Sequence, residues 1–380
     1  MSPIRQSVQF DKKLLDSDAL KIVKKLNKTG FEAYLVGGCI RDLLLGYAPK
    51  DFDIATNATP EQIQKLFKRS RVIGRRFKLV HIMFSARKFI EVATFRSGQK
   101  NPTSTKGMVL RDNFYGSLED DVFRRDFTIN GLYFEVKTSQ VIDYVGGLED
   151  LKKLQIKMIG SPSERFEEDP VRMIRAVRFK AKLKATIDLN LNKSILNNAH
   201  LIENIPPARL YEEVIKLFHN ENSLEVFREL SNLGILKYLF SQTKEDGFIS
   251  ASLNNTSERI KTGSSVTPAF LFAVFLWSAQ NKRFNELKKK KMSRIDLMIQ
   301  ASEDVIKKQI QQVMMPRWLS GRVKDIWLMQ YRLENLNSKK SRELINNPRF
   351  RMAYDFFVLR SESIDQQLKN KAEYWTKIQK

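Results

Sequence analysis

Cysteine and histidine are scarce in this chain of 380 residues. The one cysteine, Cys39, excludes an internal disulfide, and the three histidines (His81, His200 and His219) are too scattered to build a zinc site. Any metal ion is therefore expected to have oxygen ligands, which points to magnesium. We interpret Cys39 and His81 as packing residues.

Long apolar runs are also absent. No run approaches the ~20 apolar residues that cross a bilayer, and no signal peptide opens the chain, so a cytoplasmic protein is expected. Acidic residues are fewer than basic ones. The chain has 66 Lys and Arg and 43 Asp and Glu, which gives a net charge of +23 and a pI near 9.9. This excess favours a polyanionic partner, either nucleic acid or an anionic membrane surface. Residues 281–380 hold 23 basic and 11 acidic residues, or +12 of the net charge, so we expect the polyanion to dock there.

The length predicts two or three domains, and 42% hydrophobic residues are enough to fill their cores. The pattern is α+β up to about residue 150 and helical after it. Residues 1–16 are interpreted as a loose basic lead-in, and residues 97–111 as a mobile loop. The expected elements are helices over 18–26 and 60–67, strands over 31–36, 50–56, 132–135 and 141–144, a hairpin from 77–84 and 89–95, and later helices over 168–179, 206–218, 268–278, 293–314, 320–336 and 348–361.

Two aspartates carry the clearest chemical pattern. If residues 50–56 form a strand, Asp51 and Asp53 share one face, while Phe52 and Ile54 are buried on the other. Two carboxylates held so close repel each other and are stable mainly with a divalent metal between them. A DxD pattern alone is weak, since many surface strands carry alternating aspartates.

A glycine pair precedes the aspartates. Gly37-Gly38 follows an apolar run and leads into Arg41-Asp42. Backbone amides at such a turn and a guanidinium beside it can bind phosphates. Together with a two-carboxylate metal site, these are the parts that nucleotidyl transfer needs.

Further charged residues have both a functional and an ordinary interpretation. Glu91, on an otherwise apolar strand, is either a third carboxylate or a salt-bridged residue, and Arg124-Arg125-Asp126 is either part of the site or a charged turn. The helix that follows Asp169 repeats arginine at 172, 175 and 178, which is typical of a solvated face. Asp169 serves as a helix cap, or it pairs with Arg172 to offer an acceptor and a donor to a base edge. The tryptophans Trp318, Trp327 and Trp375 are interpreted as core residues rather than base-stacking platforms.

Four motifs, in order and spacing, resemble the class II nucleotidyltransferases of the DNA polymerase beta superfamily. They are LVGGCIRDLLLG with DFDIAT, RRDFTINGLYF, DYVGGLEDL and EDPVRMIRAVRF, within residues 34–179. That class holds CCA-adding enzymes and bacterial poly(A) polymerases, and these motifs do not separate the two. Segments 74–82, 110–121, 205–218 and 348–362 resemble bacterial poly(A) polymerases.

The resemblance implies a role for each matching residue. Asp51 and Asp53 would hold two magnesium ions, with either Glu91 or Asp126 as the third catalytic carboxylate. Gly37, Gly38 and Arg41 would bind the triphosphate, and Arg125, Asp126 and Asn130 the ribose and phosphates. Asp169 and Arg172 would bind the base of ATP, supported by Arg175, Arg178, Arg209 and Glu213.

The resemblance also implies a polymerase-beta-like head over residues 1–150, with a mixed sheet and helices, followed by an all-α neck (151–220), body (221–300) and leg (301–380). The implied activity is template-independent addition of AMP from ATP to RNA 3′ ends. A CCA-adding enzyme and an inactive RNA-binding protein are the alternatives. The expected partners are RNA and ATP, the protein is expected to be a monomer, and RNA-degradation proteins are possible further partners.

Overall fold

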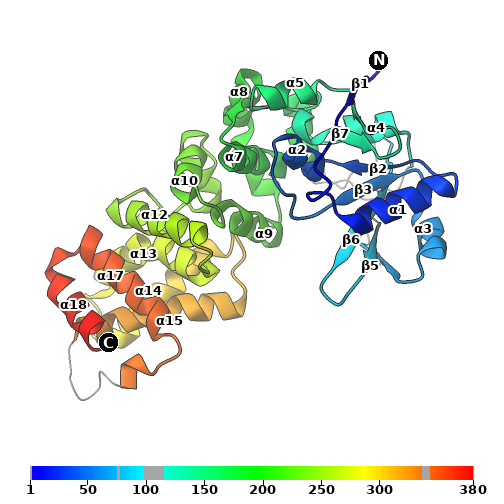
Figure 1. The fold of residues 1–380 in the computed structure, drawn as a ribbon. Coiled ribbons are helices and arrows are strands. Elements are labelled where there is room, and N and C mark those ends of the chain that lie inside the picture. The colour runs from blue at the N-terminus through cyan, green and yellow to red at the C-terminus, as the bar shows by residue number, and fades with distance from the viewer. Residues whose placement is uncertain (1, 75–77, 98–114, 336–342, 380) are drawn as a thin grey trace. The chain divides into compact units, whose positions relative to one another are not determined.

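The computed structural model describes residues 2–74, 78–97, 115–335 and 343–379. The chain forms two compact units, Met1–Arg172 with Leu183–Asn198, and Met173–Lys182 with Ala199–Lys380. Helix α7 (Val171–Leu183) contributes residues to both. Figure 1 shows the first unit in blue to green and the second in green to red.

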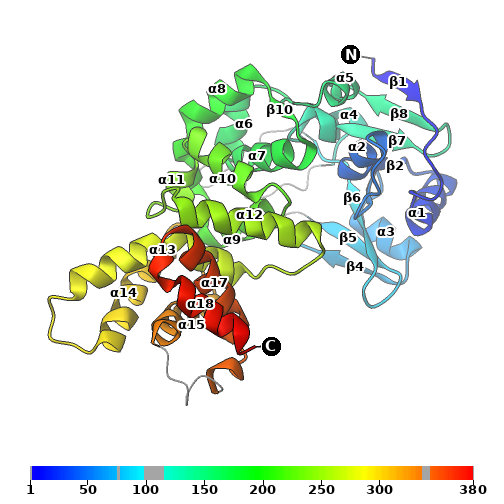
Figure 2. The same ribbon diagram turned by 60° about the vertical axis from the view of Figure 1, so that its left-hand side comes forward.

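The first unit contains a mixed sheet in the order β1-β8-β7-β2-β3-β6-β5-β4. Figure 2 shows these strands from a second direction. Neighbours are antiparallel except β3 and β6, which are parallel and place Asp53 opposite Glu91. The strands are β1 (Ile4–Ser7), β2 (Ala33–Val36), β3 (Asp53–Thr56), β4 (Ser70–Ile73), β5 (Leu79–Met83), β6 (Phe89–Thr94), β7 (Leu132–Glu135) and β8 (Gln140–Asp143).

Capping residues define the helices that pack on this sheet. Asp16 accepts from the backbone amides of Asp18 and Ala19 at the start of α1, which lies over β2 and β3 (Figure 1). Thr59 caps the start of α3 and forms a capping box with Gln62. The first unit's helical elements are α1 (Ser17–Lys28), α2 (Gly38–Leu44), α3 (Pro60–Leu66), α4 (Leu118–Phe123), η1 (Thr128–Asn130), α5 (Gly147–Lys152), α6 (Pro162–Glu168) and α8 (Leu189–Asn198), with a small parallel pair of β9 (Gln155–Ile156) and β10 (Thr186–Ile187).

The second unit is helical throughout its described residues, around a long central helix, α13 (Pro268–Leu287). Phe272 and Phe275 of this helix are buried and contact Phe240 edge to face, and α14 and α15 pack against the helix. The other elements are η2 (Ala199–Asn204), α9 (Pro207–Phe218), α10 (Ser223–Asn232), α11 (Leu236–Leu239), α12 (Gly247–Lys261), α14 (Arg294–Gln309), α15 (Arg317–Glu334), α17 (Phe350–Ser363), η3 (Gln366–Leu368) and α18 (Lys369–Lys377).

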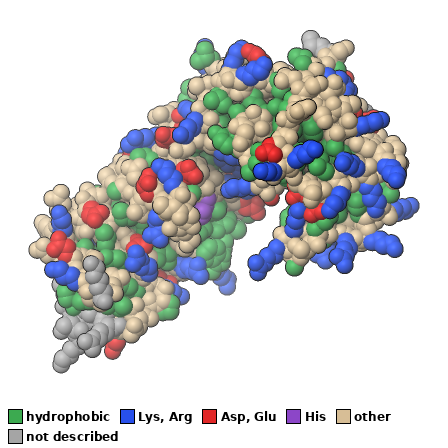
Figure 3. Space-filling view, viewed as in Figure 1, with side chains coloured by type: hydrophobic (Ala, Val, Ile, Leu, Met, Phe, Trp, Pro, Cys, Tyr) green, Lys and Arg blue, Asp and Glu red, His purple; other side chains and the backbone are tan. Residues whose placement is uncertain are grey.

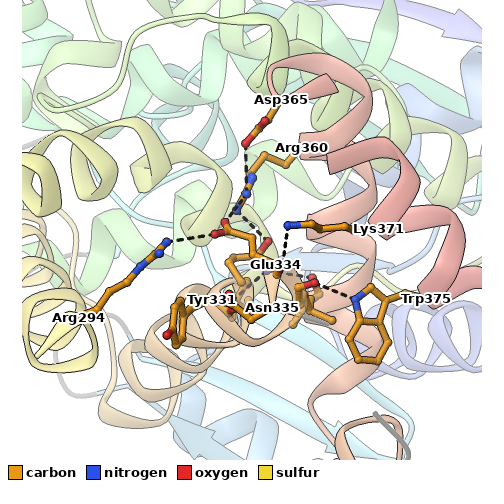
Figure 4. A network of polar contacts seen from close by, with 12 residues as sticks. Arg294, Tyr331, Glu334, Asn335, Arg360, Asp365, Lys371 and Trp375 are labelled. Carbon is orange, nitrogen blue, oxygen red and sulfur yellow. Dashed lines mark hydrogen bonds and ion pairs between the residues drawn. The ribbon is translucent and has the colours of Figure 1, made fainter. Parts of the chain in front are cut away.

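A polar network ties the C-terminal helices together (Figure 4). The buried Arg360 of α17 donates to Glu334 at the end of α15 and to Asp365, while Arg294 of α14 also pairs with Glu334. Lys371 of α18 donates to the Glu334 carbonyl. Four helices are thus joined at one carboxylate and its backbone.

The α+β and helical classes are confirmed, and three local predictions are wrong. Residues 4–7 form the edge strand β1 rather than a loose lead-in, because they pair with β8. Strand β3 begins at Asp53, so Asp51 lies in the loop before it. Trp327 and Trp375 are buried as expected, but Trp318 is 49% exposed. Asp169 caps the start of α7, as one of its two interpretations expects, because its carboxylate accepts from the Val171 amide, and it also ends α6.

The predicted loop over 97–111 lies outside the described residues except for Ser97. Among the described helices, none is long and apolar enough to cross a membrane.

Candidate active site

The carboxylates Asp51, Asp53 and Glu91 lie together at the β3–β6 pair. Asp53 and Glu91 are register partners, and Asp51 lies two residues before the strand. Burial raises the pKa of Asp53 to about 6, the charges of Glu91 and Asp51 add to the rise, and Arg125 opposes it. Asp53 nevertheless remains exposed, so solvent reaches its carboxylate. The site therefore concentrates negative charge where a cation can reach it.

His81 is a neighbour that the sequence reading assigned to packing. Its Nε2 lies 3.1 Å from Oε1 of Glu91, and its ring stacks on Phe89 at 4.2 Å between centroids. Glu91 is thus a paired strand residue, as one interpretation expects, and it is also the register partner of Asp53, while its role as a third carboxylate stays a prediction. His81 fixes the rotamer of Glu91 beside Asp53.

The glycine turn is built around a buried arginine. Gly37 has φ +71°, a conformation that favours glycine, and α2 begins at the next residue. The guanidinium of Arg41 is buried, donates twice to Asp42 and bonds Oδ1 of Asn130 at 2.6 Å. Nδ2 of Asn130 in turn donates to Asp126 at 3.1 Å. Arg41 thus joins the glycine turn to the RRD turn, and its predicted contact with phosphate would add to this structural role.

Arg125 is held by two residues that the sequence reading missed, Asp121 and Tyr133. Its Nε donates to the Tyr133 hydroxyl at 2.6 Å, and its Nη2 to Asp121 at 3.1 Å. Burial disfavours the charge of Arg125, but Tyr133 and Asp121 raise the pKa of the guanidinium above its ordinary value. A Cβ at Gly37 would lie 3.1 Å from Nη1 of Arg125, so only a small residue fits beside it. Arg125 is therefore fixed between the carboxylates and the glycine turn.

Arg165 joins the predicted base-reading residues to the same turn. It donates to the carbonyls of Arg124 and Arg125 and pairs with Glu168. Arg172 donates to the Arg165 carbonyl at 2.6 Å and to Glu168 at 2.9 Å. Asp169 and Arg172 are partly buried and three residues apart, and their role in binding a base stays a prediction.

The remaining predicted residues belong to the second unit. Arg178 donates to the buried Glu213 at 3.2 Å, and Lys216 pairs with the other oxygen of Glu213. Arg175 and Arg178 both lie over the ring of Phe179. Arg209 is exposed one helical turn before Glu213. The structure thus pairs Arg178 with Glu213, and the arginine repeat is only partly a solvated face.

A second glycine motif, Gly146-Gly147, lies where β8 leads into α5. Oδ1 and Oδ2 of Asp143 accept from the four amides of residues 145–148, and Thr128 donates to Asp150. A Cβ at Gly147 would lie 2.2 Å from the Thr128 carbonyl oxygen, so glycine is required for α5 to contact η1. The DYVGG motif therefore positions the turn that carries Asn130.

Oxygen ligands at this site fit magnesium. Within the described residues, no group of three or more His, Cys, Asp or Glu side chains is arranged to hold a metal ion. Magnesium typically takes one or two carboxylates, with substrate phosphates and water as its other ligands. Asp51 and Asp53, with Glu91 beside them, provide the one or two carboxylate ligands that magnesium takes from a protein.

Three family models match the chain. They are the "Poly A polymerase head domain" over residues 33–157, the "Probable RNA and SrmB- binding site of polymerase A" over 186–246, and the "Polymerase A arginine-rich C-terminus" over 290–380. The first covers every predicted site residue of the sheet and the glycine turns.

Solved structures define the class of the fold. The chain resembles the Bacillus stearothermophilus CCA-adding enzyme in complex with CTP, with a TM-score of 0.69 and 24% identity over 93% of this chain and 81% of that one. It also resembles the Thermotoga maritima CCA-adding enzyme complexed with tRNA, with a TM-score of 0.66 and 19% identity over 98% and 87%. The fold is that of a nucleotidyltransferase.

Sequence relatives define the family within that class. Poly(A) polymerase I of Salmonella typhi is 40% identical over 99% of this chain and 85% of its own length, and that of Haemophilus influenzae is 40% identical over 98% and 87%. A CCA-adding enzyme of Lactobacillus delbrueckii is 37% identical over 58% of this chain and 54% of its own length. The chain belongs to the bacterial poly(A) polymerase family.

Proposed function

We propose that this protein is a template-independent poly(A) polymerase. The 3′ hydroxyl of an RNA attacks the α-phosphate of ATP, a phosphodiester bond forms, and pyrophosphate leaves. The observation that carries this choice is the 40% identity to poly(A) polymerase I over 99% of the chain, against 58% coverage for a CCA-adding enzyme. The chemistry is supported by the carboxylate pair beside the glycine turn, where Asp53 is the register partner of Val36, the residue before Gly37.

The first unit supplies the reacting groups. Asp51 and Asp53 would hold two magnesium ions, which when bound lower the pKa of the attacking hydroxyl and stabilise charge on the leaving oxygens. Glu91, fixed by His81, is favoured over Asp126 as the third carboxylate, because it faces Asp53 while Asp126 accepts from the Phe127 amide and Asn130.

The glycine and RRD turns would position the nucleotide. The amides of Gly37 and Gly38, with Arg41, contact the triphosphate, and Arg125 is directed toward the same region by Tyr133 and Asp121. Asp126 and Asn130, bonded to each other, orient the ribose. These groups act by binding and orientation rather than as a general base.

Selection of ATP falls to the residues around α7. Asp169 accepts from the exocyclic amine of adenine, and Arg172 donates to a ring nitrogen, with Glu168 fixing its guanidinium. The bonded pair Arg178 and Glu213, flanked by Arg175 and Arg209, would hold α7 against α9 in the second unit.

A nucleotide-preference assay tests the activity. The protein is incubated with magnesium and each nucleotide separately, on unstructured RNA and on tRNA that lacks its CCA end. Long A tracts on unstructured RNA are expected, whereas CTP incorporation followed by a single AMP would assign the CCA-adding alternative. Binding of RNA with no turnover under magnesium or manganese would assign the inactive RNA-binding alternative.

The Asp53→Asn variant tests the metal site with two readouts. AMP addition is expected to fall by roughly 10²-fold or more, the range for removal of one charge-stabilising group. Because the substitution relieves repulsion with Glu91 and Asp51, the variant should melt above the parent in metal-free buffer. Magnesium should then raise the melting temperature of the parent but not of the variant. Asp11→Asn, at an exposed aspartate of the same unit, is the control and should behave as the parent in both assays.

The wider assignments belong to the same proposal. The head, neck, body and leg would divide at residues 150, 220 and 300. A cytoplasmic monomer that binds RNA through its basic helices fits the charge of +23. A protein of RNA degradation would dock within residues 186–246, where the matched model describes a binding site.

A further inference from the structure

A cavity of about 440 Å³ lies in the second unit, between α12, the start of α13, α15 and the start of α17. Its volume falls within the range of ligand pockets, about 300–1,000 Å³. The lining includes hydroxyl and amide groups from Asn255, Ser265 and Thr267, and the ring of Phe270. The cavity therefore offers hydrogen-bonding groups beside an aromatic wall.

The cavity is strongly positive. Four arginines (Arg259, Arg322, Arg349 and Arg351) line it against one acidic residue, Asp355. Arg259 and Arg351 donate to different oxygens of that carboxylate, so two guanidiniums share one negative charge. Arg349 pairs with Asp325, which does not line the cavity. The excess of positive charge favours an anionic ligand.

Arg322 is the lining arginine that a ligand can engage at the smallest cost. Among the described residues, no carboxylate lies within ion-pair distance of it. Its guanidinium carbon lies 5.3 Å from the ring centroid of Trp318, one helical turn earlier on α15, and both side chains are exposed. A guanidinium that lies over an exposed indole offers a positive charge and two flat surfaces, one from each side chain, to the same ligand.

We propose that this cavity, with Trp318 at its rim, is a binding site for one nucleotide unit of single-stranded RNA. A phosphate enters among the arginines with Arg322 as its unpaired partner, and the base stacks on the exposed indole or on the guanidinium plane. Arginines alone would suit any anion, and the exposed tryptophan is what favours an unpaired base. This inference rests on the proposed function, because it concerns how that enzyme holds its RNA.

Binding of a fluorescein-labelled oligo(A) strand, followed by anisotropy without ATP, tests the site. Trp318→Ala should weaken binding roughly 5- to 150-fold, the range for loss of one stacked base, and Trp318→Phe should recover part of it. Arg322→Ala should weaken binding and reduce the slope of log K against log salt by about 0.7, as expected for one phosphate contact on a single strand. An RNA duplex of equal length should show no effect of Trp318→Ala.

Arg332→Ala is the matched control. Arg332 is exposed on the same helix, about 15 Å along it, and does not line the cavity. It should bind the strand within twofold of the parent and keep its melting temperature.

Three results would overturn the site: unchanged binding in both Trp318→Ala and Arg322→Ala, an equal loss in Arg332→Ala, or an equal loss on duplex RNA. Absence of AMP addition by the parent protein would instead refute the proposed function, whatever the binding results.

Discussion

Tyr133→Phe tests whether Arg125 depends on its buried partners. Tyr133 is fully buried; its hydroxyl accepts from Nε of Arg125 at 2.6 Å and donates to Asp121 at 2.5 Å. The substitution removes one oxygen and leaves both charged partners one hydrogen bond short. Arg125 retains its 3.1 Å bond to Asp121, so the ion pair survives while its orientation is lost.

The magnitude follows from those two bonds. A hydrogen bond to a charged group contributes about 1.5–3 kcal/mol, and the two share one hydroxyl, so we expect a loss of about 2–4 kcal/mol in the free energy of unfolding of the first unit. Urea denaturation measures it. Because Arg125 is proposed to bind the nucleotide and would lose the bond that orients its guanidinium, KM for ATP should rise together with a fall in kcat.

The pH dependence gives an independent check. Burial alone would raise the pKa of Asp121, but Arg125, Tyr133 and Arg124 together lower it below the ordinary value. A carboxylate with a lowered pKa stabilises the folded protein above its unfolded pKa of about 4, and this contribution is lost as the pH falls through its folded value. Tyr133→Phe raises that folded value, so the variant should lose stability at a higher pH than the parent does. A variant with parental stability, acid sensitivity and KM would refute the positioning role of Tyr133.

Two further substitutions test the packing of each unit. Gly147→Ala should lower the free energy of unfolding by at least about 3 kcal/mol, because its Cβ would lie 2.2 Å from a backbone oxygen. Gly146→Ala is the control; with φ +79° and open space around it, it should lower the free energy of unfolding by about 1–2 kcal/mol. Equal melting temperatures of the two variants would contradict this reasoning. Arg360→Met should lower the free energy of unfolding, measured by urea denaturation, by about 3 kcal/mol, the low end for a broken buried pair, because Glu334 keeps its pairing with Arg294. A second change, Glu334→Leu, should restore much of that loss. A parental urea midpoint in the single variant would count against the network.

Local patterns predicted the elements whose residues carry their own signal. The β5–β6 hairpin has apolar runs on both sides of a polar turn, and α3 has its cap, proline and acidic first turn in sequence. Strand β1 has no such signal, since Ile4–Ser7 is exposed along its length and exists by pairing with β8. Contacts between distant segments could not be predicted either, because residues such as Arg41 and Asn130 are 89 positions apart in the sequence.

One wrong prediction, the burial of Trp318, could have been corrected from the sequence. On α15, Leu319, Val323, Ile326 and Gln330 are buried at helical spacing. Trp318 and Arg322 each precede a member of that stripe by one residue, which turns them about 100° away from it. The periodicity of the helix therefore predicts an exposed Trp318, although tryptophan as a residue type favours the core.

Several motifs of the first unit hold the same turn. The turn at residues 124–130 is held by Arg165 at its carbonyls, by Arg41 through Asn130, and by the Gly147 contact to Thr128. Most motif residues thus fix one turn, and few are free to choose a substrate. A CCA-adding relative aligned over 58% of the chain can share such a frame without sharing the product. We therefore expect the residues that determine the product to lie around α7 and in the helical second unit, outside the residues that hold this turn.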